Sequence, residues 1–256
     1  MKNTIIRYIN LFLLLVIIIS IIYLAYYNSQ KEGFTTTDDL DYYVVSMSNA
    51  DRLKNIQTQN EKLKSQTQNN EDKNNNIQII DAVVGEKLNL DELKKNGNLS
   101  PKFNDTDKNA KIKNVIGCYL SHLKIYDKIS ANNANGYSVI FEDDFSISDD
   151  FYEKMADAIH TIKTKNIDFD MCFLGVLGNT PDEQLTDNIY KCSVIYGGTH
   201  GYLINNKNAK KIISRLEYME EPIDLSIFKK NLNNELTVYK LNESIVFQNG
   251  MQSSLR

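Results

Sequence analysis

The order of hydrophobic and polar positions separates a continuous apolar segment from a longer part with mixed periodicity. Residues from Tyr8 to Tyr27 are almost all apolar, and only Asn10 and Ser20 are clearly polar. About 20 residues at ~1.5 Å each can span the ~30 Å core of a bilayer. A cleaved signal peptide is the alternative, but its apolar region is typically only ~7–15 residues long and ends at a small-residue cleavage site. We expect a transmembrane anchor.

Charges around this segment predict its orientation. Lys2 and Arg7 precede it, whereas Lys31 and several acidic residues follow it. The positive-inside rule then places the N-terminus in the cytoplasm and the rest on the lumenal or extracytoplasmic side, as in a single-pass type II membrane protein. The expected organisation is a cytoplasmic tip and anchor at 1–29, a stem at 30–40 and a domain at 41–256.

The domain alternates between two periodicities. Short apolar or β-branched runs predict strands at 41–47, 77–84, 137–141, 170–177, 196–204, 235–241 and 244–248. Apolar residues three or four apart predict helices at 51–63, 112–129, 151–162 and 206–216. Residues 64–76 and 85–111 are polar and irregular. The alternation predicts a single α/β domain with a mainly parallel, Rossmann-like sheet.

Composition and charge narrow the function. Hydrophobic residues make up 42% and charged residues 24% of the 256, which is ordinary for a globular protein. The net charge of −4 argues against a nucleic-acid partner, because neutralising phosphates requires a basic face. Cys118, Cys172 and Cys192 form no CxxC pair, so a zinc site built on thiolates is not expected. One bridge between Cys172 and Cys192 remains open.

The most informative local feature is a run of three acids, Glu142, Asp143 and Asp144. It follows an apolar strand directly, which places it at the carboxyl edge of the sheet, where open α/β sheets bind ligands. Clustered carboxylates suit Mg²⁺ or Mn²⁺, particularly beside a diphosphate. On an extended backbone Glu142 and Asp144 would face one way and Asp143 the other. The alternative is a solvated strand end that caps the next helix.

Further motifs accompany this triplet in a fixed order. They are YVVSMSNADR at 43–52, GCYLSH at 117–122, GTHGYLINNKNAKKI at 198–212, PID at 222–224 and VFQNGMQSS at 246–254, which contains Gln248. Together with the triplet they resemble glycosyltransferase family 25, the lipopolysaccharide-type and collagen-type sugar transferases, over residues 42–254. The resemblance implies a GT-A-like fold, a UDP-sugar donor, Mn²⁺ (or Mg²⁺) and an inverting transfer of a hexose. The acceptor would be a glycan, glycolipid or glycoprotein.

The resemblance also assigns roles to residues around the triplet. Asp144 would contact the metal with support from Glu142, while Asp143 would face the donor ribose or diphosphate. The nucleotide and donor pocket would be completed by Arg52, Ser121, His122, His200, Gly201, Tyr202 and Gln248.

Several candidate residues have competing interpretations. His200 is a donor contact, a metal ligand or simply a strand residue. Asp224 is our candidate for the general base that deprotonates the acceptor hydroxyl, and a helix N-cap is the alternative. His122 is either a donor contact or a buried structural histidine. Cys118 and His122 share a helix face and form a conceivable nucleophile pair, although no residue that would orient the histidine is evident.

The sequence leaves three functional hypotheses. A hexosyltransferase accounts for the ordered motifs. A non-catalytic glycan- or nucleotide-binding membrane protein on the same fold is the second, because the first-strand segment carries a single arginine, Arg52. A metal-dependent phosphoesterase is the third, since clustered acids also serve two-metal hydrolysis.

Overall fold

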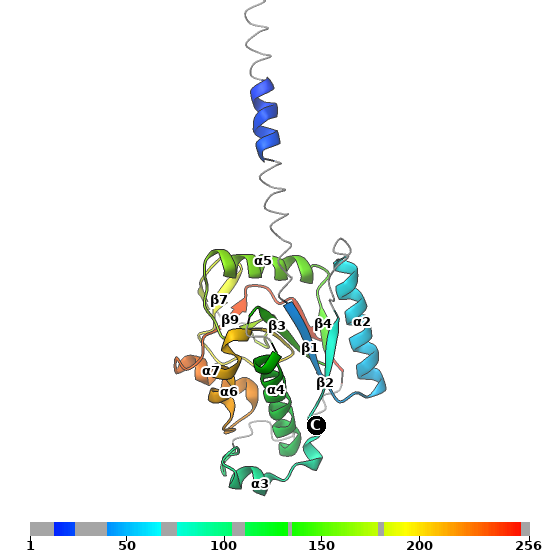
Figure 1. The fold of residues 1–256 in the computed structure, drawn as a ribbon, viewed down its shortest axis with the longest axis vertical. Coiled ribbons are helices and arrows are strands. Elements are labelled where there is room, and N and C mark those ends of the chain that lie inside the picture. Colours follow the sequence, from blue (N-terminus) through cyan, green and yellow to red (C-terminus); the bar gives the residue numbers. More distant parts are fainter. Residues whose placement is uncertain are drawn as a thin grey trace, which may run out of the picture. The chain divides into compact units, whose positions relative to one another are not determined.

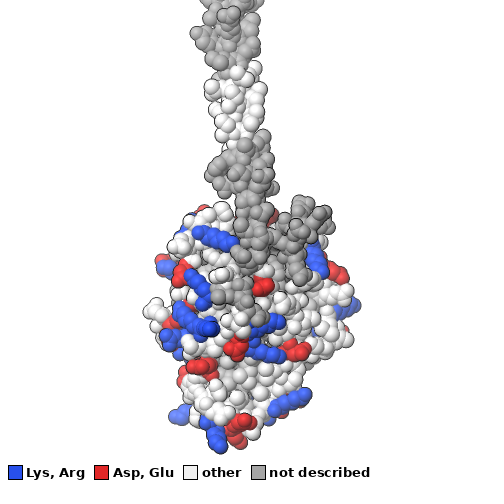
Figure 2. Space-filling model, viewed as in Figure 1, with Lys and Arg blue, Asp and Glu red and all other residues white. Residues whose placement is uncertain are grey.

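The computed structural model describes residues 13–23, 40–67, 76–103, 111–132, 135–178 and 182–251. Residues 39–256 form a compact unit in which helices cover both faces of a central sheet (Figure 1). This arrangement confirms the predicted α/β class. Over the face seen in Figure 2, acidic and basic side chains are interspersed.

The central sheet has eight strands in the order β2-β1-β3-β8-β5-β9-β7-β6. Strands β1, β2 and β3 pair in parallel, as do β5 and β9, whereas β8 and β7 run against the other six. The predicted mainly parallel direction is therefore confirmed, but the reversed strand β8 at its centre was not predicted. The bounds are β1 Leu40–Ser46, β2 Ile77–Asp81, β3 Tyr137–Glu142, β5 Met171–Phe173, β6 Glu183–Gln184, β7 Ile189–Lys191, β8 Gly201–Asn205 and β9 Val238–Leu241. A separate ribbon pairs β4 (Phe145–Ile147) with β10 (Val246–Gln248).

Two hydrophobic cores lie on opposite faces of the sheet. In β1, Tyr43 and Val45 point into one core and Tyr42 and Val44 into the other, so both faces of the strand are buried. The first core is covered by α4 (Ile112–Asn132), α6 (Ala209–Leu216) and α7 (Ile223–Leu232). The second is covered by α2 (Ala50–Gln66) and α5 (Phe151–Thr164). The fold therefore has three layers.

The carboxyl ends of β1, β2 and β3 meet at one edge of the sheet. Ser46 lies opposite Asp81, and Val45 lies opposite Glu142. Strand β2 ends three residues earlier than predicted, and the chain after Asp81 passes along this edge into a short 3₁₀ turn (Gly85–Lys87). The small helix α3 (Leu90–Lys95), which was not predicted, follows.

The structure contradicts the bridge considered between Cys172 and Cys192. Both thiols are free. Cys172 lies on β5 and Cys192 just after β7, and β9 runs between these two strands. Their side chains also belong to opposite cores, so no disulfide can join them.

The N-terminal unit is described only for residues 13–23, which are helical and exposed. Within the described part of the chain, no helix combines the length and apolar composition needed to cross a membrane. The predicted anchor at 8–27 and nearly all of the stem at 30–40 extend outside the described residues. The anchor is not supported by this structure and stays a prediction.

Candidate functional site

A cavity of about 400 Å³ opens at the edge where β1, β2 and β3 end. Ligands of open α/β sheets bind at this edge, and ~300–1,000 Å³ is the usual size of a small-molecule pocket. Six of the predicted site residues line the cavity: Arg52, Ser121, Glu142, Asp143, Asp144 and Gln248. Segments far apart in the sequence therefore converge here.

The acidic triplet does not continue as an extended strand. Strand β3 ends at Glu142, Asp143 and Asp144 form a turn, and β4 begins at Phe145. The expected alternation is therefore wrong, because both aspartates lie beside Arg52 whereas Glu142 contacts His122 and Thr199.

Asp143 is held from two sides. Its Oδ1 accepts from Arg52 Nη1 at 2.8 Å, and its Oδ2 accepts from the Met47 backbone N–H at 3.1 Å. The side chain of Asn55 on α2 also donates to the carbonyl oxygens of Asp143 and Phe145. These bonds fix the turn against the loop after β1 and the start of α2.

Asp144 has a different environment, although it lies next to Asp143. Its Oδ1 is buried and has no hydrogen-bond partner, and its Oδ2 lies 3.5 Å from Arg52 Nη1. Burial, aided by the negative charge of Glu142, raises the pKa of Asp144 to about 6 despite the opposing effect of Arg52. An unpaired carboxylate oxygen in a cavity wall fits a hard divalent cation.

Glu142 begins a buried chain of hydrogen-bonding groups. Its Oε1 lies 3.3 Å from His122 Nε2 and accepts from Thr199 Oγ1. His122 Nδ1 lies 2.7 Å from Tyr202 Oη, which lies 2.7 Å from Tyr126 Oη. Burial alone would raise the pKa of Glu142, but the bonds and charge of His122 outweigh it and hold the pKa below its ordinary value.

His122, His200, Gly201 and Tyr202 lie behind the acids and do not line the cavity. His122 is fully buried, as in the structural interpretation of this residue. The Nδ1 of His200 is buried without a partner, and burial lowers the pKa of its ring. At Gly201 a Cβ would collide with the side chain of Val246, so this position requires close approach of β8 to β10.

Asp224 lies in the first turn of α7, one residue after the helix begins at Ile223. Pro222 occupies the N-cap position, so the N-cap interpretation of Asp224 is wrong. Its Oδ2 accepts from Gly198 N–H at 3.0 Å, next to the Thr199 that bonds Glu142. Burial, together with the charge of Glu142, raises its pKa although bonds from three backbone N–H groups oppose the shift.

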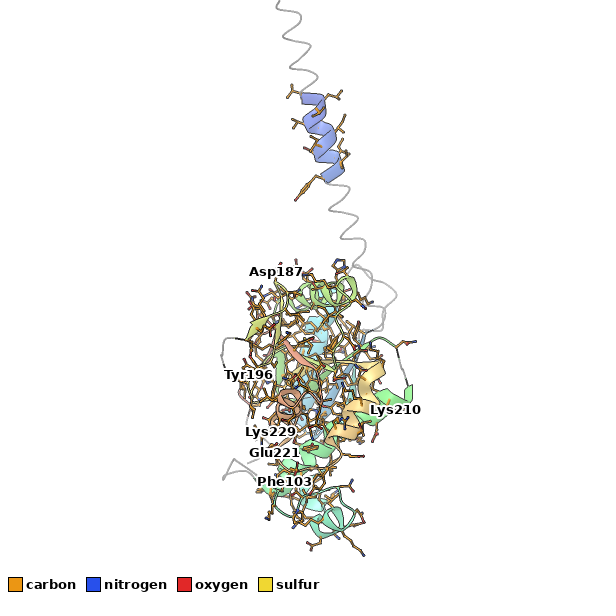
Figure 3. The ribbon with its side chains drawn as sticks, turned by 90° about the vertical axis from the view of Figure 1, so that its left-hand side faces the viewer. Phe103, Asp187, Tyr196, Lys210, Glu221 and Lys229 are labelled. Carbon is orange, nitrogen blue, oxygen red and sulfur yellow. The ribbon has the colours of Figure 1, made fainter. Side chains whose placement is uncertain are left out.

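An ion pair fixes the start of the helix that carries Asp224. Lys229 on α7 reaches back to Glu221, which immediately precedes Pro222, and the two labelled side chains lie close together in Figure 3. Through the neighbouring residues Gly198 and Thr199, Asp224 is connected to Glu142, although it does not line the cavity.

Comparison with known proteins identifies the family. The family model described as "Glycosyltransferase family 25 (LPS biosynthesis protein)" matches residues 39–227. The chain belongs to glycosyltransferase family 25. The resemblance seen in the sequence motifs is therefore confirmed.

Relatives within the family differ in their names and match only in part. Procollagen galactosyltransferase 1-A of Xenopus laevis is 29% identical over 143 residues, covering 53% of this chain and 23% of the relative. Inactive glycosyltransferase 25 family member 3 of Mus musculus is 27% identical, covering 54% and 24%. Procollagen galactosyltransferase 2 of Homo sapiens is 24% identical, covering 54% and 23%. The matched segment spans about a quarter of each of these relatives.

The family motif GCYLSH has a structural explanation here. A Cβ at Gly117 would lie 2.6 Å from Val83 O, so the segment after β2 can pack against α4 only at a glycine. Ser121 Oγ accepts from Val83 N–H at 2.8 Å and donates to Gly117 O at 2.6 Å. The motif therefore holds one wall of the cavity, while His122 supports Glu142.

Sequence reasoning missed the part of the wall that this motif holds. Residues 82–86, Lys111, Asn114 and Cys118 also line the cavity. Residues 82–84 were assigned to a strand and 85–111 to an irregular region. The available signal was the pair Gly85 and Gly117, because a Cβ on either would meet the backbone of the other segment.

Cys118 does not form an activated pair with His122. Burial and the nearby carboxylates raise the pKa of the Cys118 thiol well above its ordinary value, which keeps it protonated. The histidine, contrary to expectation, does have orienting partners in Tyr202 and Glu142.

Proposed function

We propose that this family member transfers a hexose, galactose or glucose, from a UDP-sugar to a glycan, glycolipid or glycoprotein acceptor. The observation that carries the proposal is the unpartnered Oδ1 of Asp144, buried in the wall of a nucleotide-sized cavity at the carboxyl edge of the sheet. The mixed α/β sheet is compatible with a GT-A-like fold.

The residues present fit a divalent cation, Mn²⁺ or Mg²⁺. Asp144 would hold it with support from Glu142, while Asp143 and Arg52 keep the turn in place. When bound, the cation neutralises the charge that develops on the departing diphosphate. Without a cation, the cavity wall carries four acids, Glu86 and the acidic triplet, against Arg52 and Lys111, a charge balance that disfavours a diphosphate.

Asp224 is the proposed base. Its carboxylate is fixed by the N–H groups of Gly198 and Leu225, and its raised pKa improves it as a proton acceptor. As the acceptor hydroxyl oxygen forms a bond to the sugar C1, its proton passes to Asp224 and the bond from C1 to the UDP oxygen breaks. Attack from the face opposite UDP inverts the anomeric carbon.

The names of relatives bear on the donor and the acceptor. Two of the three relatives described above are named procollagen galactosyltransferases, which states galactose and a protein acceptor for those proteins. We extend this to the present chain as a proposal that UDP-galactose is among its donors. The proposed anchor at 8–27 would place the reaction at a membrane, with the domain on the lumenal or extracytoplasmic side.

A second candidate function is binding of a nucleotide or glycan without transfer. It is favoured by the engagement of Arg52 with Asp143, because this pair leaves both partners less available to a donor. One of the three relatives described above is also named as inactive.

Donor turnover separates these candidates. The purified full-length chain, in mild detergent, is incubated with Mn²⁺ and each of several UDP-hexoses, and release of UDP is measured. We expect release from one donor, lost on chelation and in Asp144→Ala but kept in Asp149→Asn, which changes a neighbouring exposed acid.

Three other results would contradict the proposed metal-dependent transfer. Donor binding without any UDP release, even by slow hydrolysis, would replace transfer with the binding function. Release that persists after chelation would contradict the assignment of the acidic turn. Hydrolysis of simple phosphoesters would indicate a phosphoesterase.

A further inference from the structure

A second set of ligating atoms lies beside the acidic turn. The Sγ of Cys118, a ring nitrogen of His122 and a carboxylate oxygen of Glu142 all lie within 4.8 Å of one another. Cys118 and His122 are four residues apart on α4, so they share one face of a rigid helix, and Glu142 ends the central strand β3. Ordered elements therefore position all three groups.

The residues around these three groups form hydrogen bonds like those that orient the ligands of a metal ion. Ligating histidines usually bond their second ring nitrogen to a fixed oxygen, and ligating carboxylates are bonded in turn. Here His122 Nδ1 lies 2.7 Å from Tyr202 Oη, which is held by Tyr126, and Thr199 bonds Glu142. His122 Nε2 then faces Glu142 Oε1 at 3.3 Å, a contact that needs either a proton or a cation between the atoms.

The three groups can be reached from the cavity, and their chemistry favours one kind of metal ion over others. Cys118 and Glu142 line the cavity, so a metal held by the three groups would keep an open position towards it. Three protein ligands with one open position are typical of catalytic zinc sites, whereas structural zinc sites have four protein ligands. Thiolate and imidazole favour zinc over magnesium and manganese, whereas the all-oxygen environment of Asp144 favours the harder ions.

We propose that Cys118, His122 and Glu142 form a zinc-binding site at the wall of the cavity, beside the hard-cation position at Asp144 that Glu142 also supports. Binding replaces the thiol proton of Cys118 with Zn²⁺ and releases that proton to solvent. Zinc also replaces any proton shared by His122 and Glu142, so the site competes with protons. It uses one thiolate only, and therefore differs from the cysteine-rich sites that the sequence argues against.

Cobalt reports directly on this site, because Co²⁺ bound to a thiolate shows a charge-transfer absorption in the near ultraviolet. The full-length chain is stripped with chelator and titrated with Co²⁺, then with Zn²⁺. We expect the band to saturate, to disappear when Zn²⁺ displaces Co²⁺, and to persist in excess Mg²⁺. Cys118→Ser should abolish the band, whereas Cys192→Ser, which removes a thiol remote from the cavity, should retain it.

Alkylation of the unmutated chain provides a check that needs no variant. Iodoacetamide should label Cys118 at least about tenfold more slowly with Zn²⁺ present, as measured by peptide mass spectrometry. The proposal is overturned if no thiolate band forms, if the band survives Cys118→Ser, or if Zn²⁺ does not protect Cys118. None of these readouts needs turnover, so loss of the proposed transferase activity would leave the zinc site standing.

Discussion

Two adjacent aspartates show how far the environment of a single residue governs its chemistry. Both oxygens of Asp143 are bonded, to Arg52 and to the Met47 amide, whereas Asp144 keeps a buried oxygen without a partner. The sequence predicted the three acids as an extended strand end and Asp144 as their metal contact, a role that remains to be tested. It could not predict the clamp on Asp143, because that depends on how the loop after β1 packs against the turn.

The raised pKa of Asp144 predicts a stability effect in the absence of metal. Its pKa is about 6 in the folded chain against 3.8 for the unperturbed group, so its ionisation makes folding less favourable as pH rises from about 4 to about 6. Asp144→Asn removes that cost. In chelator we expect the variant to melt a few degrees higher at about pH 7.5, a gain of ~1–2 kcal/mol after losing the attraction to Arg52.

The advantage of Asp144→Asn should shrink at about pH 5, where much of Asp144 is already protonated in the folded chain. Thermal unfolding of both proteins at the two pH values gives the comparison. If the variant and the unmutated chain have the same melting temperature at both pH values, burial of the ionised Asp144 does not destabilise the fold.

Replacement of Asp224, again a single residue, tests its proposed role as the base through its effect on kcat. Asp224→Asn keeps the shape of the side chain but removes the proton acceptor, so we expect kcat to fall ~10²–10⁴-fold with little change in donor KM. Asp187→Asn, an exposed acid on the surface, is the matched control (Figure 3). A large rise in donor KM with unchanged kcat would instead make Asp224 a binding residue.

At the scale of elements, the site depends on how α4 packs against the segment that leaves β2. The helix itself was predicted from its apolar spacing at 112–129 and extends to Asn132. The packing was not predicted, because β2 looked as if it continued to Val84. Tertiary contacts decide this boundary, since Ser121 bonds Val83 N–H and draws the chain out of the sheet.

Two serines on α4 test that packing with the same substitution. Ser121→Ala leaves the part-buried Val83 N–H without an acceptor, so we expect a loss of ~1–3 kcal/mol in unfolding free energy and weaker UDP binding. Ser130→Ala removes an exposed bond to Asp127 O and should change stability by less than ~0.5 kcal/mol. Chemical denaturation measures both, and equal effects would mean that Ser121 does not hold the cavity wall.

At the scale of the whole molecule, periodicity predicted the α/β class, because strands that are buried on both faces have continuous apolar runs in the sequence. The sequences of β1 and β3 fit this pattern. The short strands β4, β6 and β7 were missed, since two or three residues carry no readable period. The reversed direction of β8 was missed because strand direction depends on how the connecting segment returns, which local sequence does not encode.

The proposed anchor makes a prediction about localisation. In a membrane-containing expression host, the full chain should fractionate with membranes and resist extraction by high salt. A chain starting at residue 39, where the compact unit begins, should move to the soluble fraction and still bind UDP. If the full chain is already released by salt, the apolar segment is not an integral anchor.

Calorimetric titration of UDP into the full-length chain tests the central claim most directly, namely that the acidic turn binds a nucleoside diphosphate together with a divalent cation. We predict saturable binding with Mn²⁺ that weakens at least about tenfold in chelator and in Asp144→Asn, but not in the exposed-acid control Asp149→Asn. Equal affinity in Mn²⁺ and chelator, or unchanged binding in Asp144→Asn, would contradict the account.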